Sequence, residues 1–203
     1  MTQDAEPAKP GLRAACIAAR RALSARDRAL ETAGFTEHLL QLRTALAARR
    51  IAAYLSSRIE PDTRPFLNMV IADGAEIILP VAREDGLMDW VAADGESERP
   101  SALGVPEPIG DILSPLALDA VELIIAPALA VDRAGHRLGK GRGYYDRMLS
   151  TMVHRPPVFA LVRDPEVVAA LPHEPFDQAV DGAITPTRII RFAAPATPGF
   201  ARQ

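Results

Sequence analysis

The feature that most constrains this chain is a glycine-rich segment that follows its most apolar stretch. Residues 121–131 are apolar on both faces, which is typical of a strand buried inside a parallel sheet. Gly139, Gly141 and Gly143 then occupy every second position ahead of a helical pattern over residues 144–149. A glycine-rich turn leading into a helix exposes backbone N–H donors and the positive end of the helix dipole. The segment therefore predicts a site for phosphate oxygens.

Cationic side chains alternate with these glycines. Arg137, Lys140 and Arg142 add full positive charge to the turn. Lys140 is one of only two lysines among 23 lysines and arginines, and its compact ammonium suits a phosphoryl group in transfer. The spacing fits neither common nucleotide loop: a Walker loop needs Ser or Thr where Gly141 stands, and a dinucleotide fingerprint needs glycine where Tyr144 stands. The pattern indicates an anion cradle of another type.

Two readings stay open for this segment. A generic glycine-rich turn is about as often a flexible, solvated basic loop as a ligand site. Asp146, just past the glycines, is either a salt-bridge partner for the surrounding cations or a ligand that holds magnesium against phosphates.

Length and composition favour one self-contained domain over residues 1–203. The chain has 203 residues, of which 48% are hydrophobic and 24% charged, as in globular proteins. A net charge of −3 counts against a nucleic-acid surface, and Cys16, the single cysteine, excludes an internal disulfide. No apolar run reaches the ~20 residues of a membrane span, and residues 1–10 do not resemble a signal peptide. We expect a cytoplasmic protein with frayed ends at residues 1–8 and 192–203.

Strand and helix patterns alternate along the chain. Helices are expected over residues 11–26, 66–72 and 165–171, and another should begin at an N-cap on Thr36. Strands are expected over residues 51–55, 76–81, 121–131, 158–162 and 183–184. The irregular stretch over residues 83–119 should contain one hairpin strand, over residues 87–92. The first helix should bury Leu12, Cys16, Ala19 and Leu23 and expose Arg20. This alternation predicts an α/β fold: a single three-layer domain with a mostly parallel central sheet flanked by helices.

Residues 137–146, Arg-Leu-Gly-Lys-Gly-Arg-Gly-Tyr-Tyr-Asp, closely resemble the signature of the 5-formyltetrahydrofolate cyclo-ligase (5,10-methenyltetrahydrofolate synthetase) family. The resemblance covers most of the chain. Further segments follow the family's landmarks in order: Lys9 to Arg13, Tyr54-Leu55, Glu60 to Thr63, Leu79-Pro80, Gly104 to Pro108, Pro127 to Asp132, and Asp177. The resemblance implies a ligase of one-carbon metabolism that uses ATP and Mg²⁺ to convert 5-formyltetrahydrofolate, with or without a polyglutamate tail, into 5,10-methenyltetrahydrofolate. We also expect a monomer or weak dimer, and the charge and apolar pattern predict no nucleic-acid or membrane partner.

The resemblance assigns roles to individual residues. ATP contacts are implied for Lys9, Pro10, Gly11, Leu12, Arg13, Arg137, Leu138, Gly139, Lys140, Gly141, Arg142, Gly143, Tyr144 and Tyr145. Folate contacts are implied for Leu55, Glu60, Lys140, Gly141, Arg142, Gly143 and Tyr144, of which Lys140, Arg142 and Tyr144 are catalytic. Asp146 and Asp177 are the implied magnesium ligands, although Asp181 competes with Asp177 on residue type alone.

Several of these residues could have a purely structural role instead. Lys9 and Arg13 could form a solvated helix face, Leu55 could be core, Glu60 could be a turn carboxylate, and the paired tyrosines could pack. The chain also departs from the family pattern, with Val81 where many members have arginine and Leu103-Gly104 where an aromatic residue can stand. Met88 and Trp90 are the expected substitutes near the pterin. Trp90 could equally be a core residue of the hairpin.

Two rival functions use the same residues. A nucleotide- or reduced-folate-binding protein could retain anions on the glycine segment without turnover. RNA binding by the Arg/Gly segment is least favoured, because the chain as a whole is acidic.

Overall fold

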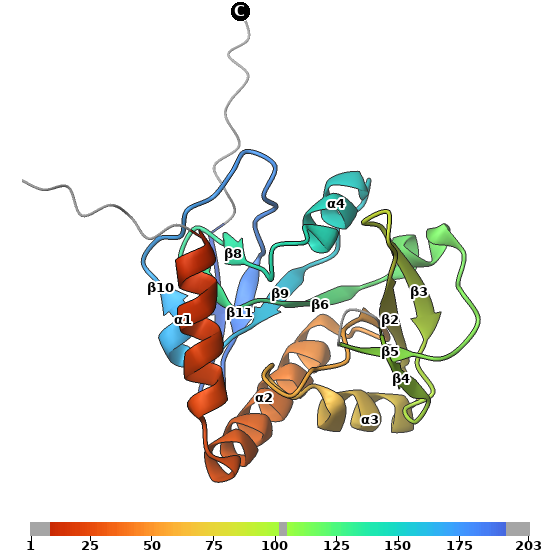
Figure 1. The fold of residues 1–203 in the computed structure, drawn as a ribbon. Helices are drawn as coiled ribbons and strands as arrows, with labels where there is room; N and C mark the ends of the chain where they lie inside the picture. The colour runs from red at the N-terminus through yellow and green to blue at the C-terminus, as the bar shows by residue number, and fades with distance from the viewer. Residues whose placement is uncertain (1–8, 102–104, 194–203) are drawn as a thin grey trace, which may run out of the picture.

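A seven-stranded sheet with helices on both faces forms the body of the protein (Figure 1). The computed structural model describes residues 9–101 and 105–193, so expectations for residues 1–8, 103–104 and 194–203 lie outside it. The strand order is β12-β11-β9-β6-β1-β2-β3. The strands are β1 (Arg50–Ala52), β2 (Glu76–Ala82), β3 (Met88–Ala92), β6 (Leu123–Pro127), β9 (Val158–Leu161), β11 (Gly182–Ile184) and β12 (Ile189–Arg191). Only the edge strands β3 and β12 pair antiparallel, which confirms the mostly parallel sheet.

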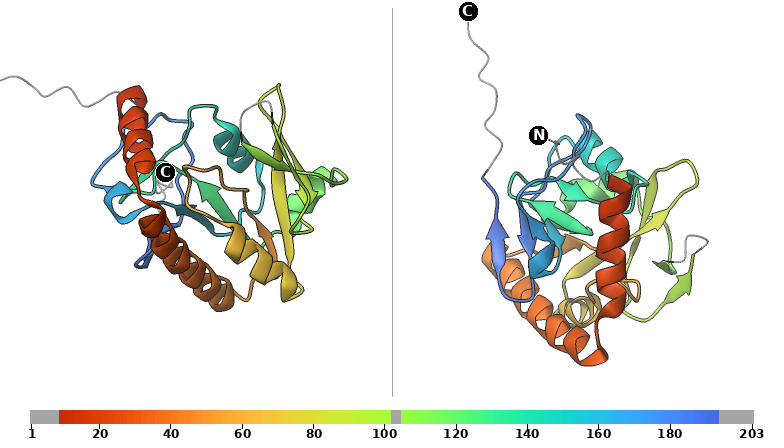
Figure 2. Two further views of the ribbon diagram at one scale, coloured as in Figure 1. Left: turned by 60° about the horizontal axis from the view of Figure 1, so that its bottom comes forward. Right: turned by 60° about the vertical axis from the view of Figure 1, so that its left-hand side comes forward.

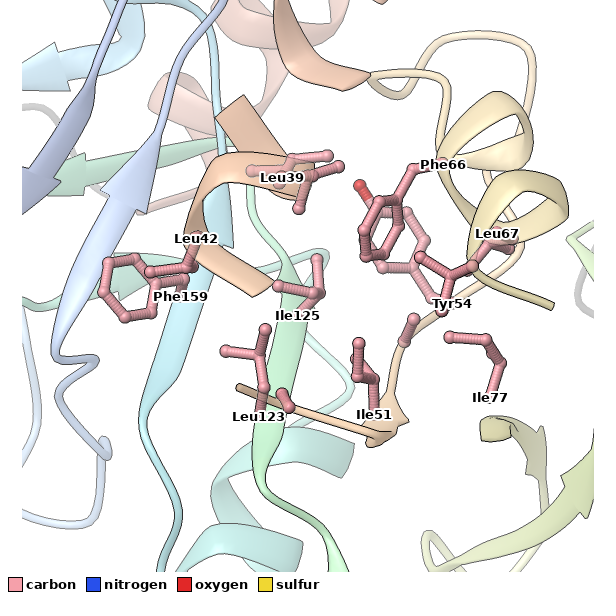
Figure 3. Packing of buried hydrophobic residues seen from close by; sticks show 14 of the residues in the cluster. Leu39, Leu42, Ile51, Tyr54, Phe66, Leu67, Ile77, Leu123, Ile125 and Phe159 are labelled. Atoms are coloured by element: carbon pink, nitrogen blue, oxygen red, sulfur yellow. The ribbon is translucent and has the colours of Figure 1, made fainter. Parts of the chain in front are cut away.

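Alternate residues of the central strands point to opposite layers. On one face, Leu123 and Ile125 of β6 pack with Leu39 and Leu42 of α2 (Ala25–Leu46) and with side chains of α3 (Arg64–Ala72), as Figure 3 shows. On the other face, Ile124 packs in a cluster with residues of α4 (Tyr144–Thr151). Two further views show the sheet between α2 and α3 on one side and α4 on the other (Figure 2). The expected three layers are therefore present.

The first helix, α1 (Lys9–Ala22), packs on a small sheet beside the main one. That sheet has the order β10-β7-β8 and consists of β7 (Ala130–Asp132), β8 (Arg137–Leu138) and β10 (Val167–Val168). Leu12 and Cys16 lie against its buried cluster, as their spacing predicted. The predicted buried face of this helix is wrong near its end, because Ala19 is exposed and Arg20 is fully buried. Arg20 can be buried because both carboxylate oxygens of Glu166 accept hydrogen bonds from its guanidinium over 2.7 Å.

The second helix begins earlier than its apolar pattern suggested. Ser24 is its N-cap, and the Ser24 side chain accepts a hydrogen bond from the backbone N of Asp27. Thr36 lies in the middle of α2, where its hydroxyl donates to the carbonyl of Thr32 instead of capping a helix start. The expected Thr36 cap is therefore wrong, and one 22-residue helix covers this region.

Tertiary hydrogen bonds changed several strand and helix boundaries. The apolar run over residues 121–131 forms two strands, because Leu129 N leaves the main sheet and donates to Leu138 O over 2.7 Å. The helix expected over 165–171 is wrong: a short 3₁₀ turn, η2 (Asp164–Glu166), is followed by β10, which pairs with β7. The strand expected over 51–55 ends at residue 52. Phe192, expected in the frayed tail, donates its backbone N to Asp181 O.

The stretch over residues 83–119 contains more structure than its composition indicated. The hairpin β2–β3 is present as expected. The sequence missed β4 (Glu98–Pro100), β5 (Pro106–Pro108) and the 3₁₀ helix η1 (Pro115–Ala120). Trp90 is buried in the core cluster on the α4 face of the sheet. Of its two expected roles, the structure therefore supports that of a core residue. In the described part of the chain, no helix has both the length and the apolar character of a membrane span.

Candidate active site

One cavity of about 650 Å³ collects most of the residues that the sequence singled out. It lies beyond the carboxyl ends of β1 and β6, where Tyr54, Leu55 and Ala128 border it. The hairpin β2–β3, the start of α1, the glycine segment and the loop over residues 174–177 supply the other walls. Ligands of open α/β sheets bind at this edge, because the loops that leave parallel strands converge there. The location is therefore that of a ligand site.

The glycine segment needs its glycines for backbone geometry. Gly143 is the N-cap of α4 with φ of 69°, and Gly141 has φ of 96°. Arg13 of α1 reaches across to this segment and donates from Nε to Gly139 O over 2.9 Å. A Cβ atom on Gly141 would stand 3.3 Å from Cζ of Arg13. The absence of a side chain at Gly141 thus leaves room for the Arg13 guanidinium beside the backbone turn.

Lys140 and Glu60 join two parts of the cavity. The Lys140 Nζ lies 2.9 Å from Oε1 of Glu60. The other carboxylate oxygen of Glu60 accepts hydrogen bonds from the backbone N and hydroxyl of Ser57, over 2.9 and 2.6 Å. Glu60 is buried, whereas the ammonium of Lys140 is partly open to solvent. The glycine segment's lysine is therefore in direct contact with the carboxylate that follows β1.

Arg137 is buried in the cavity wall beside Asp146. Its Nη2 donates to Oδ1 of Asp146 over 2.8 Å, and its side chain is only 4% exposed. Burial lowers the pKa of Arg137 more than the Asp146 carboxylate raises it. The Nε atom of Arg137 has no hydrogen-bond partner. The Arg137 guanidinium therefore places a positive charge in the wall of the cavity.

A second carboxylate pairs with the start of α1. The Lys9 Nζ lies 2.7 Å from Oδ2 of Asp177, which also accepts from the backbone N of Glu174. Partial burial acts to raise the pKa of Asp177, but these hydrogen bonds lower it overall, so the carboxylate is ionised at neutral pH. Asp181, the competing candidate, does not line the cavity and accepts from Val158 N at the start of β9.

The carboxylates fit a magnesium ion that is also held by phosphate. Asp146 and Asp177 line the same cavity. Mg²⁺ in phosphoryl-transfer sites is bound through one or two carboxylates together with substrate phosphates and water. Among residues 9–101 and 105–193 no group of three or more His, Cys, Asp or Glu side chains is arranged to hold a metal by itself. A metal held by these two carboxylates would therefore need further ligands, such as phosphate oxygens or water.

Most other candidates also border the cavity. Its lining includes Pro10, Leu138, Arg142, Tyr144 and Tyr145. Gly11 and Leu12 are not in the lining, and Leu12 packs instead against the small sheet. Their contacts with ATP stay predictions, as do all the individual roles.

The sequence assigned no role to Phe176, which lines the cavity. Tyr54 and Glu107 line it too, and both lie in segments that resemble the family's landmarks, although neither was assigned a role of its own. Met88, the expected substitute near the pterin, also lines the cavity. The hydroxyls of Tyr54 and Tyr145 are buried without partners, and burial raises the pKa of both. Glu107 is held by the backbone N of Ala82. Only the adjacency of Phe176 to Asp177 could have indicated Phe176.

A neighbouring cavity of about 680 Å³ shares Glu60 and Pro106 with this one. Four arginines line it, but three are already bound: Arg28 donates to carbonyl oxygens, Arg163 to Glu31, and Arg64 to Ser56 and Glu98. It contains none of the glycine segment, so the chemistry is assigned to the first cavity.

These features define an α/β protein whose cationic glycine segment and carboxylates share a cavity beyond a parallel sheet. Comparison with known proteins narrows the class. The sequence profile of the 5-formyltetrahydrofolate cyclo-ligase family matches residues 5–186. The chain belongs to this family, which confirms the resemblance seen in its motifs and the expectation of an enzyme of this kind.

Individual relatives agree with the family match. The chain is 36% identical over 148 residues to the 5-formyltetrahydrofolate cyclo-ligase of Mycolicibacterium smegmatis, covering 70% of this chain and 76% of the relative. It is 30% identical over 146 residues to the Escherichia coli K12 protein of that name, covering 70% and 80%. Among solved structures, the 5,10-methenyltetrahydrofolate synthetase of Aquifex aeolicus is similar with a TM-score of 0.76 at 26% identity, covering 95% of this chain and 97% of that one.

Proposed function

We propose that this chain catalyses the ATP- and Mg²⁺-dependent cyclisation of 5-formyltetrahydrofolate to 5,10-methenyltetrahydrofolate, with release of ADP and phosphate. Family membership supports the reaction class. The observation that carries the proposal for this chain is the 2.9 Å contact between Lys140 and Glu60. It sets the cation suited to a transferring phosphate beside the carboxylate suited to the N–H donors of a pterin, within one cavity.

The reaction has two bond-forming steps. The formyl oxygen attacks the γ-phosphorus of ATP, and the bond from that phosphorus to the ADP oxygen breaks. N10 then attacks the activated formyl carbon, loses its proton, and expels phosphate together with the former formyl oxygen. The product is a five-membered ring with a cationic N5–CH–N10 unit. A phosphoryl transfer of this kind needs mainly positioning and charge neutralisation, and a strong general base is not required.

The cavity's residues divide these tasks. Lys140 and Arg142, with the backbone N–H groups of the glycine segment, neutralise charge on the transferred phosphate, while Tyr144 borders the reacting groups. Lys9 and Arg13 would bind the nucleotide from α1. Asp146 and Asp177 would hold Mg²⁺, which would supply neutralisation of phosphate charge.

Binding must rearrange the ion pairs of the free protein. Glu60 can accept from a pterin, and Lys140 can bind a phosphate, only when their mutual contact is loosened. Leu55, which lies against the core cluster and lines the cavity, offers the apolar wall for the folate ring.

An absorbance assay tests the proposal directly. Purified protein with MgATP and 5-formyltetrahydrofolate should produce the ultraviolet absorbance of a methenyl product, with one ADP formed per product. Folded protein that binds both ligands by calorimetry but gives no absorbance gain and no ADP would reject the reaction and favour a binding protein without turnover.

The proposal extends to the protein's setting. We place the reaction in the cytoplasm and expect a monomer or weak dimer without a membrane or nucleic-acid partner. Light scattering over a concentration series tests the oligomeric state, and a stable larger assembly would contradict this part.

A further inference from the structure

Phe176 is an exposed aromatic residue at the rim of the cavity, and no step of the proposed reaction uses it. Its side chain is 65% exposed. Among the large exposed hydrophobic residues of the described chain, Phe176 is the one that lines this cavity. Single exposed apolar side chains are ordinary on protein surfaces. An aromatic ring bordering a cavity rich in cations and carboxylates is instead a candidate for ligand contact.

An ordered turn presents this ring. Asp177 N donates to Glu174 O over 2.9 Å, and Oδ2 of Asp177 accepts from Glu174 N over 2.9 Å, so residues 174–177 are closed on themselves. The ion pair from Lys9 to Asp177 ties this turn to the start of α1. A ring on a turn that is already fixed loses little conformational freedom when it binds a ligand.

Contacts between the side chains order the groups along the cavity. Glu60 meets Lys140, and Gly139, next to Lys140, meets Arg13. Arg13 lies one helical turn from Lys9 on α1, and Lys9 meets Asp177. The sequence of groups therefore runs from the folate-side carboxylate, over the glycine segment, to the turn that carries Phe176. Figure 1 shows α1 and the hairpin β2–β3 on opposite sides of the segment that leads to α4.

A nucleotide has only one orientation that suits this order. Its terminal phosphate must face the folate, which places it at Lys140, beside Glu60. The remaining phosphates then extend toward Arg13 and Lys9, so the base emerges at the opposite end, where Phe176 and Pro10 border the cavity. A planar, weakly polar base matches an exposed aromatic face at that point.

We infer that Phe176 is the stacking platform for the base of ATP, a binding residue that the glycine signature does not include. The inference rests on the proposed use of ATP by this cavity. Asp177 and Glu174, one and two residues from Phe176 in sequence, line the same cavity. Stacking acts on the base alone, so the phosphate contacts of Lys9 and the glycine segment are independent of it.

The test compares ATP with inorganic tripolyphosphate, which carries the phosphates without a base. Phe176→Ala should raise the KM for ATP by roughly tenfold, within the range measured when a stacked aromatic is removed. The kcat at saturating ATP and the KM for 5-formyltetrahydrofolate should stay within about twofold of the wild type. The inhibition constant of tripolyphosphate should not change. Phe176→Trp should restore the KM for ATP.

A matched control and two outcomes decide the matter. Val153→Ala removes an apolar side chain that is 86% exposed and does not line the cavity, and it should leave all four constants unchanged. An unchanged KM for ATP in Phe176→Ala would overturn the inference. So would a parallel loss of tripolyphosphate affinity, because that result would indicate a disturbed Asp177 turn.

The same comparison separates this inference from the proposed reaction. If the wild-type protein shows no cyclisation, calorimetry with a non-hydrolysable ATP analogue and with tripolyphosphate replaces the kinetics. A loss of analogue affinity in Phe176→Ala, with tripolyphosphate binding retained, would support the platform even when the reaction is rejected. Equal analogue affinity in the variant and the wild type would reject the platform.

Discussion

The buried ion pair between Arg20 and Glu166 should make Glu166→Gln strongly destabilising. Arg20 is 0% exposed, and its Nε and Nη2 donate to the two carboxylate oxygens over 2.7 Å each. Burial lowers the pKa of Arg20, but the hydrogen bond and charge of Glu166 raise it overall. Arginine stays charged without its partner. Leaving that buried charge uncompensated costs about 3–5 kcal/mol, or about 6–20 °C in Tm for a chain of this size.

Denaturant and thermal unfolding of matched variants measure this cost. Glu98→Gln is the control, because the side chains of Glu98 and its partner Arg64 are 40% and 36% exposed and such pairs contribute less than about 1 kcal/mol. The double change Arg20→Met with Glu166→Leu should recover most of the lost stability, since it removes both charges. A loss for Glu166→Gln no larger than that of the control would refute the reasoning.

Three further predictions concern the cavity. Lys140→Ala should lower kcat about 10²–10³-fold but weaken folate binding far less, because the charge of Lys140 matters most as phosphate charge develops. Kinetics and calorimetry measure the two losses, and equal losses would argue against a role of Lys140 in phosphoryl transfer. Gly141→Val should remove most ATP affinity, because φ of 96° is strained for a branched residue and its Cβ atom would displace the Arg13 guanidinium 3.3 Å away. Normal ATP affinity of this variant by calorimetry would contradict the anion cradle. Asp146→Asn should raise the Mg²⁺ concentration that gives half-maximal activity, whereas Asp181→Asn should not; an unchanged Mg²⁺ titration for Asp146→Asn would place the metal elsewhere.

Local patterns predicted the parts of the fold that depend on neighbours in sequence. The glycine segment, the hairpin β2–β3 and α3 were recognisable because turn residues and apolar periodicity act over a few positions. The helix expected over residues 165–171 failed because Val167 and Val168 pair with β7, a strand 36 residues away in the register. Local propensity carries no information about such a partner.

The residues of the candidate site likewise divide into those that a local motif predicted and those that it did not. Lys140, Gly141 and Asp146 were predicted because one continuous motif contains them. Phe176 was missed, since its neighbours in sequence give no sign that the turn over residues 174–177 meets α1. Only the cavity distinguishes Asp177, which lines it, from Asp181, which does not, because both are aspartates within one short segment.

The sequence by itself determined the family, the alternation of strands and helices, and the backbone turn that can surround a phosphate. These depend on residue order and on the backbone freedom of glycine. Only the tertiary structure decided that Arg20 is buried and that Lys140 contacts Glu60. Both facts join positions far apart in the chain, 146 residues apart for Arg20 and Glu166. A charge can leave water, or bridge two binding regions, only where folding brings its partner within hydrogen-bond distance.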